Sequence, residues 1–439
     1  MLKELLFKNK VGNNAFWIII CSIVQSIISL VIGMITARYL GPSNYGVINY
    51  AASVAAFAIP IMGLGINNIL VQELINNRDK EGEVLGSSLV LRGISAVFCF
   101  FGVLAFVMIA NKSETETIVV CLLYSVMIFF QVFSVFNYWF QSKFKSKISS
   151  IITLAAFALV AFYKVFLLVS QKNIYWFASI SALEYLVIAI LLLIFYKIKK
   201  GSRLSFSAST AKNLFRKGKY YIIAELMVMV FQHTDRIMIK LMLGNDQNGY
   251  YSAAITCVGL AGFVFVAIID SFRPMIFENK KISEEAYEKS LKLLYSIVFY
   301  FSLIYSLVMT IFSKYIVYLL YGNDYSPASN PLMIAVWYVS FSYFGSVRNI
   351  WLLAEGKYKN IIFINLFGAF TNVGLNFLFI PIMHIEGAAL ASLLTQFFTN
   401  FVLGFILPQL RDNNKIMFKS LNPKVLIDAI KERRVNNEG

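Results

Sequence analysis

Charged residues are scarce in this chain of 439 residues, where they make up 14% of the sequence while hydrophobic residues make up 59%. A soluble domain carries about a quarter of charged residues, so this composition excludes an ordinary soluble domain. Histidine occurs twice and cysteine four times, and the cysteines fall inside apolar runs without the spacing of metal ligands. We therefore expect neither a disulfide framework nor a bound metal or other cofactor.

Long apolar runs, by contrast, are abundant. A helix needs about 20 predominantly apolar residues to cross the hydrocarbon layer of a bilayer, and twelve such runs follow one another along the chain. The sequence thus predicts an all-α polytopic membrane protein with twelve transmembrane helices. They lie at roughly residues 15–37, 45–70, 84–110, 117–140, 147–169, 175–196, 220–243, 249–273, 290–312, 332–353, 360–383 and 386–408.

Short catalytic motifs are missing as well. The sequence contains no G-x-S-x-G nucleophile turn and no Walker loop, and the loops leave no space for a catalytic domain outside the membrane. We expect no enzyme activity. Active transport would have to draw on an H⁺ or Na⁺ gradient or on the gradient of the substrate itself.

The net charge of +16 is distributed unevenly. With the N-terminus in the cytoplasm, the cytoplasmic loops and tails hold 30 of the 39 Lys and Arg residues, and the opposite loops hold four. This asymmetry follows the positive-inside rule and predicts that both termini are cytoplasmic. The lipid bilayer accounts for the basic charge, so no nucleic-acid partner is expected.

Two pairs of segments indicate that a six-helix unit occurs twice. Leu40–Gly46 and Leu243–Gly249 share the pattern L-G-x4-G, and the S-V-x-N-x-W of Ser134–Trp139 recurs in Ser346–Trp351. The second pair is followed in both copies by K-x-K, and the offsets between copies are 203 and 212 residues. A duplicated bundle predicts two pseudo-symmetric six-helix lobes around a central cavity.

The segment 197–219 carries eight basic residues and no acidic one. We interpret it as a basic cytoplasmic linker between a lobe at 1–196 and a lobe at 220–410. Residues 411–439 would then form a basic cytoplasmic tail.

Ionisable residues inside spans cost about 2.5–3.5 kcal/mol each and normally face protein or water. In the span at 220–243, Gln232, Arg236 and Lys240 share one helical face, and Asp235 flanks it. The two cations on this face favour an aqueous cavity over a packing seam. Similar polar stripes on the first two helices contain Gln25 and Asn49, and for them a cavity and a packing seam are equally good interpretations.

Further cationic candidates for the cavity lie on other predicted helices or beside them. Arg348 lies near a helix end and also has a simple structural interpretation, and Lys164 could extend toward the interface. The deep charges are basic on balance, and arginine matches phosphate geometry with paired donors, so we expect an anionic, phosphorylated substrate. These candidates are Arg38, Arg92, Lys164 and Arg348.

Several segments resemble one family. The run Thr36–Gly46 (TARYLGPSNYG) is similar to the segment that joins the first two helices of the polysaccharide-export flippases, which belong to the multidrug/oligosaccharidyl-lipid/polysaccharide (MOP) superfamily. Similar segments then follow in the order of the family: Thr234–Ile239, Gly249–Ala254, Tyr321–Tyr325 and Ile385–Ala391.

This resemblance implies a two-lobed flippase of the bacterial cytoplasmic (inner) membrane that works by alternating access. Its substrate would be an undecaprenyl-pyrophosphate-linked oligosaccharide, such as an O-antigen repeat unit, moved from the cytoplasmic to the outer leaflet. Helices 1, 2, 7 and 8 would line a cationic cavity, with Arg236 as the expected contact to pyrophosphate. A polysaccharide polymerase and chain-length proteins would be partners.

Three alternatives stay open at this point. An ion-coupled drug or metabolite antiporter of the same fold often carries an acidic residue in helix 1, and helix 1 has none here. Lipid-II flippases share the fold but typically carry two more helices than the twelve predicted. A membrane glycosyltransferase or a scaffold is the third, although the external loops offer few acidic residues for catalysis.

Overall fold

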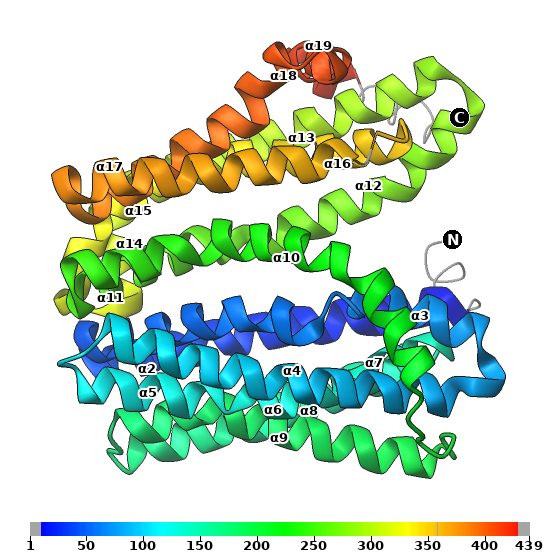
Figure 1. The fold of residues 1–439 in the computed structure, drawn as a ribbon. Coiled ribbons are helices and arrows are strands. Elements are labelled where there is room, and N and C mark those ends of the chain that lie inside the picture. Colours follow the sequence, from blue (N-terminus) through cyan, green and yellow to red (C-terminus); the bar gives the residue numbers. More distant parts are fainter. Residues whose placement is uncertain (1–9, 358, 429–439) are drawn as a thin grey trace. The chain divides into compact units, whose positions relative to one another are not determined.

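The computed structural model describes residues 10–357 and 359–428, and helices form almost all of this part of the chain. The fold divides into two compact units, Met1–Gly249 and Tyr250–Gly439 (Figure 1). Of the basic tail predicted at 411–439, the residues 429–439 lie outside the described part.

The first unit consists of long helices connected by short turns. Its helices are α2 (Lys10–Gly63), α3 (Asn67–Asn76), α4 (Glu81–Ala110), α5 (Thr115–Ser125), α6 (Met127–Gln131), α7 (Val135–Ser142), α8 (Ser146–Val169), α9 (Ile174–Ile198) and α10 (Ala208–Leu243). The helix α11 (Asn245–Val258) begins at the end of this unit and continues into the second.

The second unit is also built of helices connected by short turns. Its helices are α12 (Gly262–Ile282), α13 (Glu284–Ile311), α14 (Ser313–Tyr321), α15 (Ser329–Ala335), α16 (Tyr338–Ala354), α17 (Lys359–Phe397), α18 (Leu403–Ile406) and α19 (Arg411–Ser420). Within this unit α13 packs against α12 and α16, and α17 packs against α15 and α16.

Eight helical segments in the described part of the chain are long and apolar enough to cross a membrane. The two longest, Ile23–Asn76 and Lys359–Ile406, contain 54 and 48 residues, so each exceeds twice the ~20 residues that one crossing needs. Both contain a backbone break, at Gly41 (φ 73°, ψ 171°) and at His384 (φ 53°, ψ −134°). The predicted class, an all-helical multi-pass membrane protein, is confirmed.

The helix α10 begins earlier than predicted. The sequence predicted a linker through residue 219, but the helix starts at Ala208, where the Ser207 Oγ accepts the backbone N–H of Thr210 at 3.4 Å. Residues 208–219 of the predicted linker are thus helical, and this part of the helix buries Leu214 and Gly218; the linker between the lobes stays a prediction.

This helix packs against α2, α3 and α4, all of the first unit. The compact units consequently divide at residues 249 and 250, whereas the predicted lobes divide at 219 and 220. The two six-helix lobes remain a prediction about topology.

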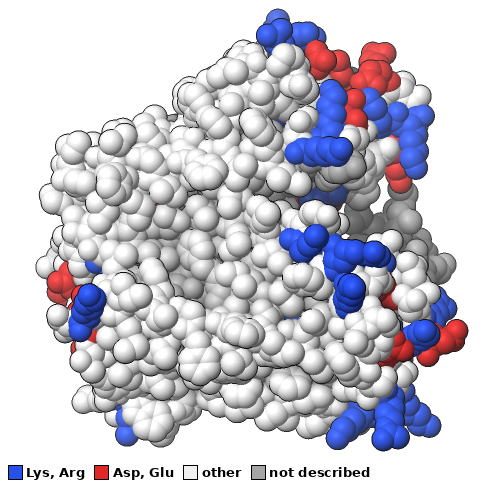
Figure 2. Space-filling model, viewed as in Figure 1, with Lys and Arg blue, Asp and Glu red and all other residues white. Residues whose placement is uncertain are grey.

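Small residues allow close packing inside the first unit. Ala51, Ala55 and Ala58 of α2 are almost fully buried. In a membrane, apolar burial itself drives helix association only weakly, and small side chains increase the van der Waals contact between helices. On the face drawn in Figure 2, the charged side chains gather at the helix ends of each unit, and the surface over the middle of the helices is uncharged.

Candidate functional site

Polar contacts along the whole length of α10 connect it to the rest of the first unit. The Lys217 Nζ lies 2.6 Å from the Glu73 Oε1, and the Asn68 Nδ2 donates to the Glu225 Oε1 at 2.6 Å. These two contacts join α10 to α3 and restrict the rotation of α10 about its axis. The polar face predicted from the sequence therefore has a defined orientation within the first unit.

Lys240 has a structural partner that the sequence did not suggest. Its side chain is buried, and its Nζ donates to the Glu114 Oε2 at 2.6 Å, between α4 and α5. The same Nζ lies 5.1 Å from the centre of the Tyr50 ring. Partial burial raises the pKa of Glu114, but hydrogen bonds from Lys240 and Thr117 outweigh this and leave the pKa below its ordinary value. Lys240 thus stabilises the packing of α10.

Arg236, one helical turn before Lys240, differs in having no such partner. Its side chain is half-buried, and its Nε is fully buried. Among the described residues this Nε has no hydrogen-bond partner, and no carboxylate forms an ion pair with the guanidinium. Buried donors are normally satisfied, so an unsatisfied cationic donor inside a membrane protein indicates a site for an anion.

A short polar row connects Arg236 to α2. The His233 Nδ1 lies 3.4 Å from the Ser53 Oγ, and this hydroxyl donates to the backbone oxygen of Asn49 at 2.8 Å. The Arg236 charge acts on the His233 ring, which lies three positions earlier on the same helix. Two hydrogen bonds thus connect His233, Ser53 and the backbone oxygen of Asn49, and Arg236 lies one helical turn after His233 on α10. The sequence analysis missed His233, although its i, i+3 spacing to Arg236 was a usable signal.

The other candidates on α10, α2 and α8 occupy varied environments. Gln232 is exposed on α10, and Asp235 is buried with only 7% of its surface accessible. Gln25 is half-buried on α2, and Arg38 is exposed three residues before the break at Gly41.

Lys164 lies partly buried on α8, where the charge of Glu184 of α9 acts on it. Both residues belong to the first unit and carry opposite charges on neighbouring helices.

Arg92 and Arg348 hold helices together. The guanidinium of Arg92 on α4 donates to the Asn67 Oδ1 at 3.2 Å, the Ser134 Oγ at 3.0 Å and a backbone oxygen, that of Gln131, at 3.2 Å. Arg348, in the second unit, donates to the backbone oxygen of Thr399 at 2.9 Å. Both side chains are at most 3% exposed, and their terminal nitrogens hydrogen-bond within their own units, while the Nε of each, like that of Arg236, has no hydrogen-bond partner among the described residues.

The S-V-x-N-x-W segment of the first unit ends beside a buried carboxylate. Glu81, the first residue of α4, accepts the Trp139 indole N–H at 2.9 Å and the Ser202 hydroxyl at 3.0 Å. The Lys143 Nζ lies 2.6 Å from its other oxygen. One carboxylate thereby joins α4, the end of α7 and the segment that follows α9.

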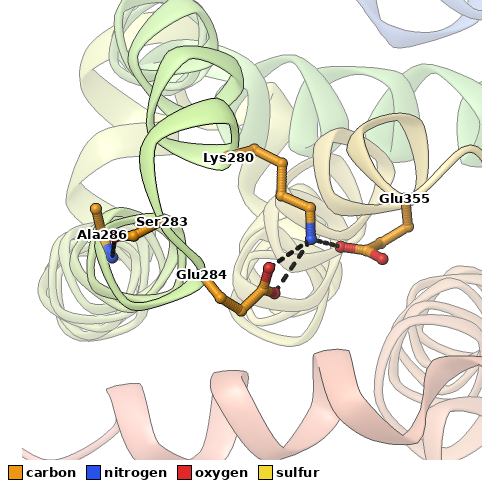
Figure 3. A network of polar contacts seen from close by, with 5 residues as sticks. All are labelled: Lys280, Ser283, Glu284, Ala286 and Glu355. Atoms are coloured by element: carbon orange, nitrogen blue, oxygen red, sulfur yellow. Dashed lines mark hydrogen bonds and ion pairs between the residues drawn. The ribbon is translucent and has the colours of Figure 1, made fainter.

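The second unit has a cluster at the corresponding positions. Figure 3 shows the Lys280 ammonium between two carboxylates, 2.8 Å from the Glu284 Oε2 and 2.7 Å from the Glu355 Oε1. Glu284 begins α13 and follows Glu81 by 203 residues. Glu355 follows α16 and lies 212 residues after Lys143. These separations equal the offsets of the two sequence repeats.

The L-G-x4-G segments also correspond in geometry. Gly41 and Gly244 both have positive φ with an extended ψ, 73° and 171° against 96° and −176°. A Cβ on Gly46 would lie 2.0 Å from the backbone oxygen of Asn245, and a Cβ on Gly249 would lie 2.0 Å from that of Pro42. Each contact becomes the other when 203 residues are added to or subtracted from its residue numbers. The two segments therefore pack on each other in a nearly symmetric way.

No group of three or more His, Cys, Asp or Glu side chains suited to a metal ion occurs in residues 10–357 and 359–428. The polar row offers a guanidinium, an imidazole and a hydroxyl, which can bind an anion and orient it.

Comparisons with solved structures give the same fold over most of the chain. An inward-facing multidrug resistance MATE family transporter of the MOP superfamily superposes with a TM-score of 0.73 at 15% identity, covering 90% of this chain and 96% of the other. The lipid II flippase MurJ in an inward closed conformation superposes with a TM-score of 0.69 at 16% identity, covering 94% and 92%.

A MOP superfamily transporter from Pyrococcus furiosus superposes with a TM-score of 0.58 at 13% identity, covering 94% of this chain and 98% of the other. No curated protein sequence matches this chain. The family model described as "Polysaccharide biosynthesis protein" matches residues 11–280, more than half of the chain. The resemblance drawn from the sequence is thus confirmed: the chain belongs to the polysaccharide biosynthesis protein family and is a multi-pass membrane transporter with the fold of the MOP superfamily.

Proposed function

We propose that this protein is a flippase for a lipid-linked glycan. It would move an undecaprenyl-pyrophosphate-linked oligosaccharide, an O-antigen or related repeat unit, from the cytoplasmic to the outer leaflet by alternating access. The observation that carries this proposal is Arg236, a half-buried guanidinium of a membrane helix whose Nε lacks a hydrogen-bond partner among the described residues. A pyrophosphate supplies the paired oxygen acceptors that a guanidinium prefers.

The polar row around Arg236 suits the headgroup of such a substrate. Ser53 and His233 provide a hydroxyl and an imidazole on two different helices. Polar groups of this kind suit a sugar–phosphate linkage, while the Arg236 guanidinium provides the attraction for its charge. Lys240 does not add to this attraction, because Glu114 already neutralises it.

A duplicated architecture would support alternating access. We propose twelve transmembrane helices in two pseudo-symmetric lobes, 1–196 and 220–410, around a central cavity. The support for this is the matched geometry of Gly41 and Gly244, together with the reciprocal contacts of Gly46 and Gly249. Inverted or parallel repeats of this sort let a transporter open to either side of the membrane by similar movements.

The cellular setting follows from the charge distribution and the family. We place the protein in the bacterial inner membrane with both termini in the cytoplasm, where it would work beside a polysaccharide polymerase and chain-length proteins. An H⁺ or Na⁺ gradient could supply the energy, in agreement with the absence of a nucleotide-binding motif.

The test is a deletion of the gene, followed by mass spectrometry of the lipid-linked glycans and a gel of the surface polysaccharide. The proposal predicts loss of surface polymer and accumulation of a lipid-linked oligosaccharide, both reversed by the wild-type gene. Normal polymer without accumulation, in a strain that lacks another flippase, would favour the drug or metabolite antiporter.

A further inference from the structure

The amino-terminal part of α10, residues 208–219, has one buried and one exposed face. Ala211, Leu214 and Gly218, spaced three and four residues apart, are buried. A Cβ on Gly218 would lie 2.4 Å from the backbone oxygen of Leu64, so this face packs closely on the first unit. The whole helix has 36 residues, and about 20 are enough for one crossing. Residues 208–219 therefore extend α10 beyond its predicted span as an amphipathic segment.

The exposed face of this segment is basic and aromatic. It carries Lys212, Phe215, Arg216, Lys219 and Tyr220, which recur at helical spacing and are all exposed. Phe215 is 44% exposed and Tyr220 is 70% exposed, so both rings lie at the surface of the unit. The Lys219 Nζ lies 5.1 Å from the centre of the Tyr220 ring. Cations and rings thus alternate along one face of the helix.

The positive charge of this face is not neutralised. The ion pair with Glu73 uses Lys217, and within residues 10–357 and 359–428 no carboxylate forms an ion pair with the three cations of the face. The surrounding segment 197–219 contains no acidic residue. The face therefore attracts anions.

The chain that leads into α10 has a fixed course over α4. The Ser205 N–H donates to the backbone oxygen of Gly82 at 3.2 Å. A Cβ on Gly86 would lie 2.2 Å from the backbone oxygen of Ser205, so this segment lies directly on the helix. It exposes Arg203 and Phe206, the latter by 56%. The combination of an exposed cation and an exposed ring therefore continues before the start of α10.

Insertion topology alone does not account for these features. The positive-inside rule needs Lys and Arg near the ends of a span, but neither rings between them nor a fixed helical face. Here the Ser207 hydroxyl caps the helix, and the buried stripe holds the exposed face in one orientation. The basic and aromatic face is thus preformed for a ligand at the surface of the bilayer.

We propose that this face, together with Arg203 and Phe206, binds anionic phospholipid at the bilayer surface. Basic side chains attract anionic headgroups, and aromatic rings favour the level of the headgroups. A helix surface of this kind binds lipid through its apolar area and its charge together, whereas a soluble anion would use the cations alone. The bound lipid would hold the amino-terminal end of α10, the helix that carries Arg236.

The test uses the purified full-length protein in nanodiscs of phosphatidylcholine that contain a phosphatidylglycerol with a photoreactive group near its headgroup. Cross-linked peptides are mapped by mass spectrometry. One variant combines Lys212→Gln, Arg216→Gln and Lys219→Gln. The matched control combines Lys415→Gln, Lys419→Gln and Lys424→Gln, which removes the same charge from exposed positions of the second unit.

The proposal predicts labelling of residues 203–220 that falls about tenfold in the α10 variant and stays unchanged in the control variant. Equal labelling of the two variants would overturn it. Equal labelling of the wild type by a photoreactive phosphatidylcholine would also overturn it, because the site would then not recognise charge. Competition by soluble glycerol phosphate would assign the face to a free phosphate and overturn the lipid.

A second measurement needs no variant. Labelling of the wild-type protein by phosphatidylglycerol should decrease as salt rises from about 0.1 M to about 1 M, because exposed charges are screened. Labelling that does not vary with salt would contradict the role of the cations. The substitutions leave the buried stripe intact, so a thermal unfolding scan should show a folded α10 variant. The experiment involves no glycan, and its result is independent of the flippase test.

Discussion

The amino ends of α4 and α13 carry the same residue in the two copies of the repeat, yet the ion pairs built on them differ. In the first unit the carboxylate of Glu81 is buried and pairs with Lys143. In the second unit the position of Lys143 is taken by Glu355, and Lys280 lies between the two carboxylates. The positions of the charged residues are equivalent, but Lys143 of the first unit corresponds to Glu355 of the second. The cation that pairs with Glu355, Lys280, comes from α12.

The two units also differ in how much charge they bury. Among the described residues, Arg348 is the one buried charged residue of the second unit, whereas the first unit buries five. The five are Glu73, Glu81, Arg92, Asp235 and Lys240. Burying a charge costs free energy, so more of this cost falls in the first unit, which also contains Arg236. The difference follows the compact units and not the predicted repeat, because α10 belongs to the second predicted lobe but packs in the first unit and brings Asp235 and Lys240 there.

The largest loss of stability is expected from substitutions of Gly46 and Gly249, where the two L-G-x4-G segments pack on each other. In Gly249→Ala the new methyl group would lie 2.0 Å from the backbone oxygen of Pro42, and we expect a loss of about 3 kcal/mol, at the upper end of the cost of overpacking. Gly46→Ala should cost a similar amount, because its contact is equivalent. Thermal unfolding of the purified variants measures both. Gly33→Ala, with open space around its Cβ, is the control and should be neutral. A large difference between the stability losses of the Gly46 and Gly249 variants would contradict the symmetry of this contact.

The next largest loss of stability should distinguish the Glu81–Lys143 ion pair from the cluster around Lys280. Glu81→Gln leaves the Lys143 ammonium without its buried carboxylate, and we expect a loss of about 2–3 kcal/mol, below the full cost of a buried pair because Lys143 reaches water. Glu355→Gln should cost about 1 kcal/mol or less, since its side chain is 22% exposed against 6% for Glu81. Equal shifts of the melting temperature would contradict the contrast between the units.

The two cations of α10 should respond in opposite ways. Lys240→Met removes the ion pair with Glu114 and the contact with the Tyr50 ring, at a cost of about 1–2 kcal/mol. Arg236→Met removes a donor that has no acceptor among the described residues, so stability should be unchanged or slightly higher. Export should respond the other way, with loss in the Arg236 variant and partial function in the Lys240 variant. Melting curves and surface-polysaccharide gels of the same variants decide this.

The smallest effect is a pH dependence at Glu114. Its pKa is lower in the folded protein than in the unfolded chain, so its ion pair stabilises the fold above the unfolded pKa and loses this effect as the pH falls through the folded value. The difference in stability between the wild type and Glu114→Gln, about 0.5 kcal/mol because the side chain is 44% exposed, should therefore shrink below about pH 4.3. A difference that does not vary with pH would show that the pair contributes nothing.

Hydropathy and the order of similar segments were sufficient to predict the helical membrane class and the family. The matched backbone geometry of the two L-G-x4-G segments agrees with their sequence pattern, because glycine is favoured wherever φ is positive or backbones approach closely. The start of α10 at Ala208 could not be predicted, since basic residues before a span suggest a loop.

The partners of the intramembrane charges were equally hidden. Lys240 and Glu114 lie 126 residues apart, and Arg92 uses backbone and hydroxyl acceptors that no charge pattern predicts. The helical face of Gln232, Arg236 and Lys240 identified the helix that carries the candidate site. It could not show which cation lacks a partner, because that depends on contacts with other helices.

The most direct test of the central claim, that Arg236 binds the phosphate end of a lipid-linked glycan during transport, is a translocation assay in proteoliposomes. The purified protein is reconstituted with a lipid-linked oligosaccharide, and its appearance in the opposite leaflet is followed with a membrane-impermeant reagent. The account predicts transport by the wild type, none in Arg236→Ala and partial transport in Arg236→Lys, with all three proteins equally stable. Undiminished transport by Arg236→Ala would contradict it.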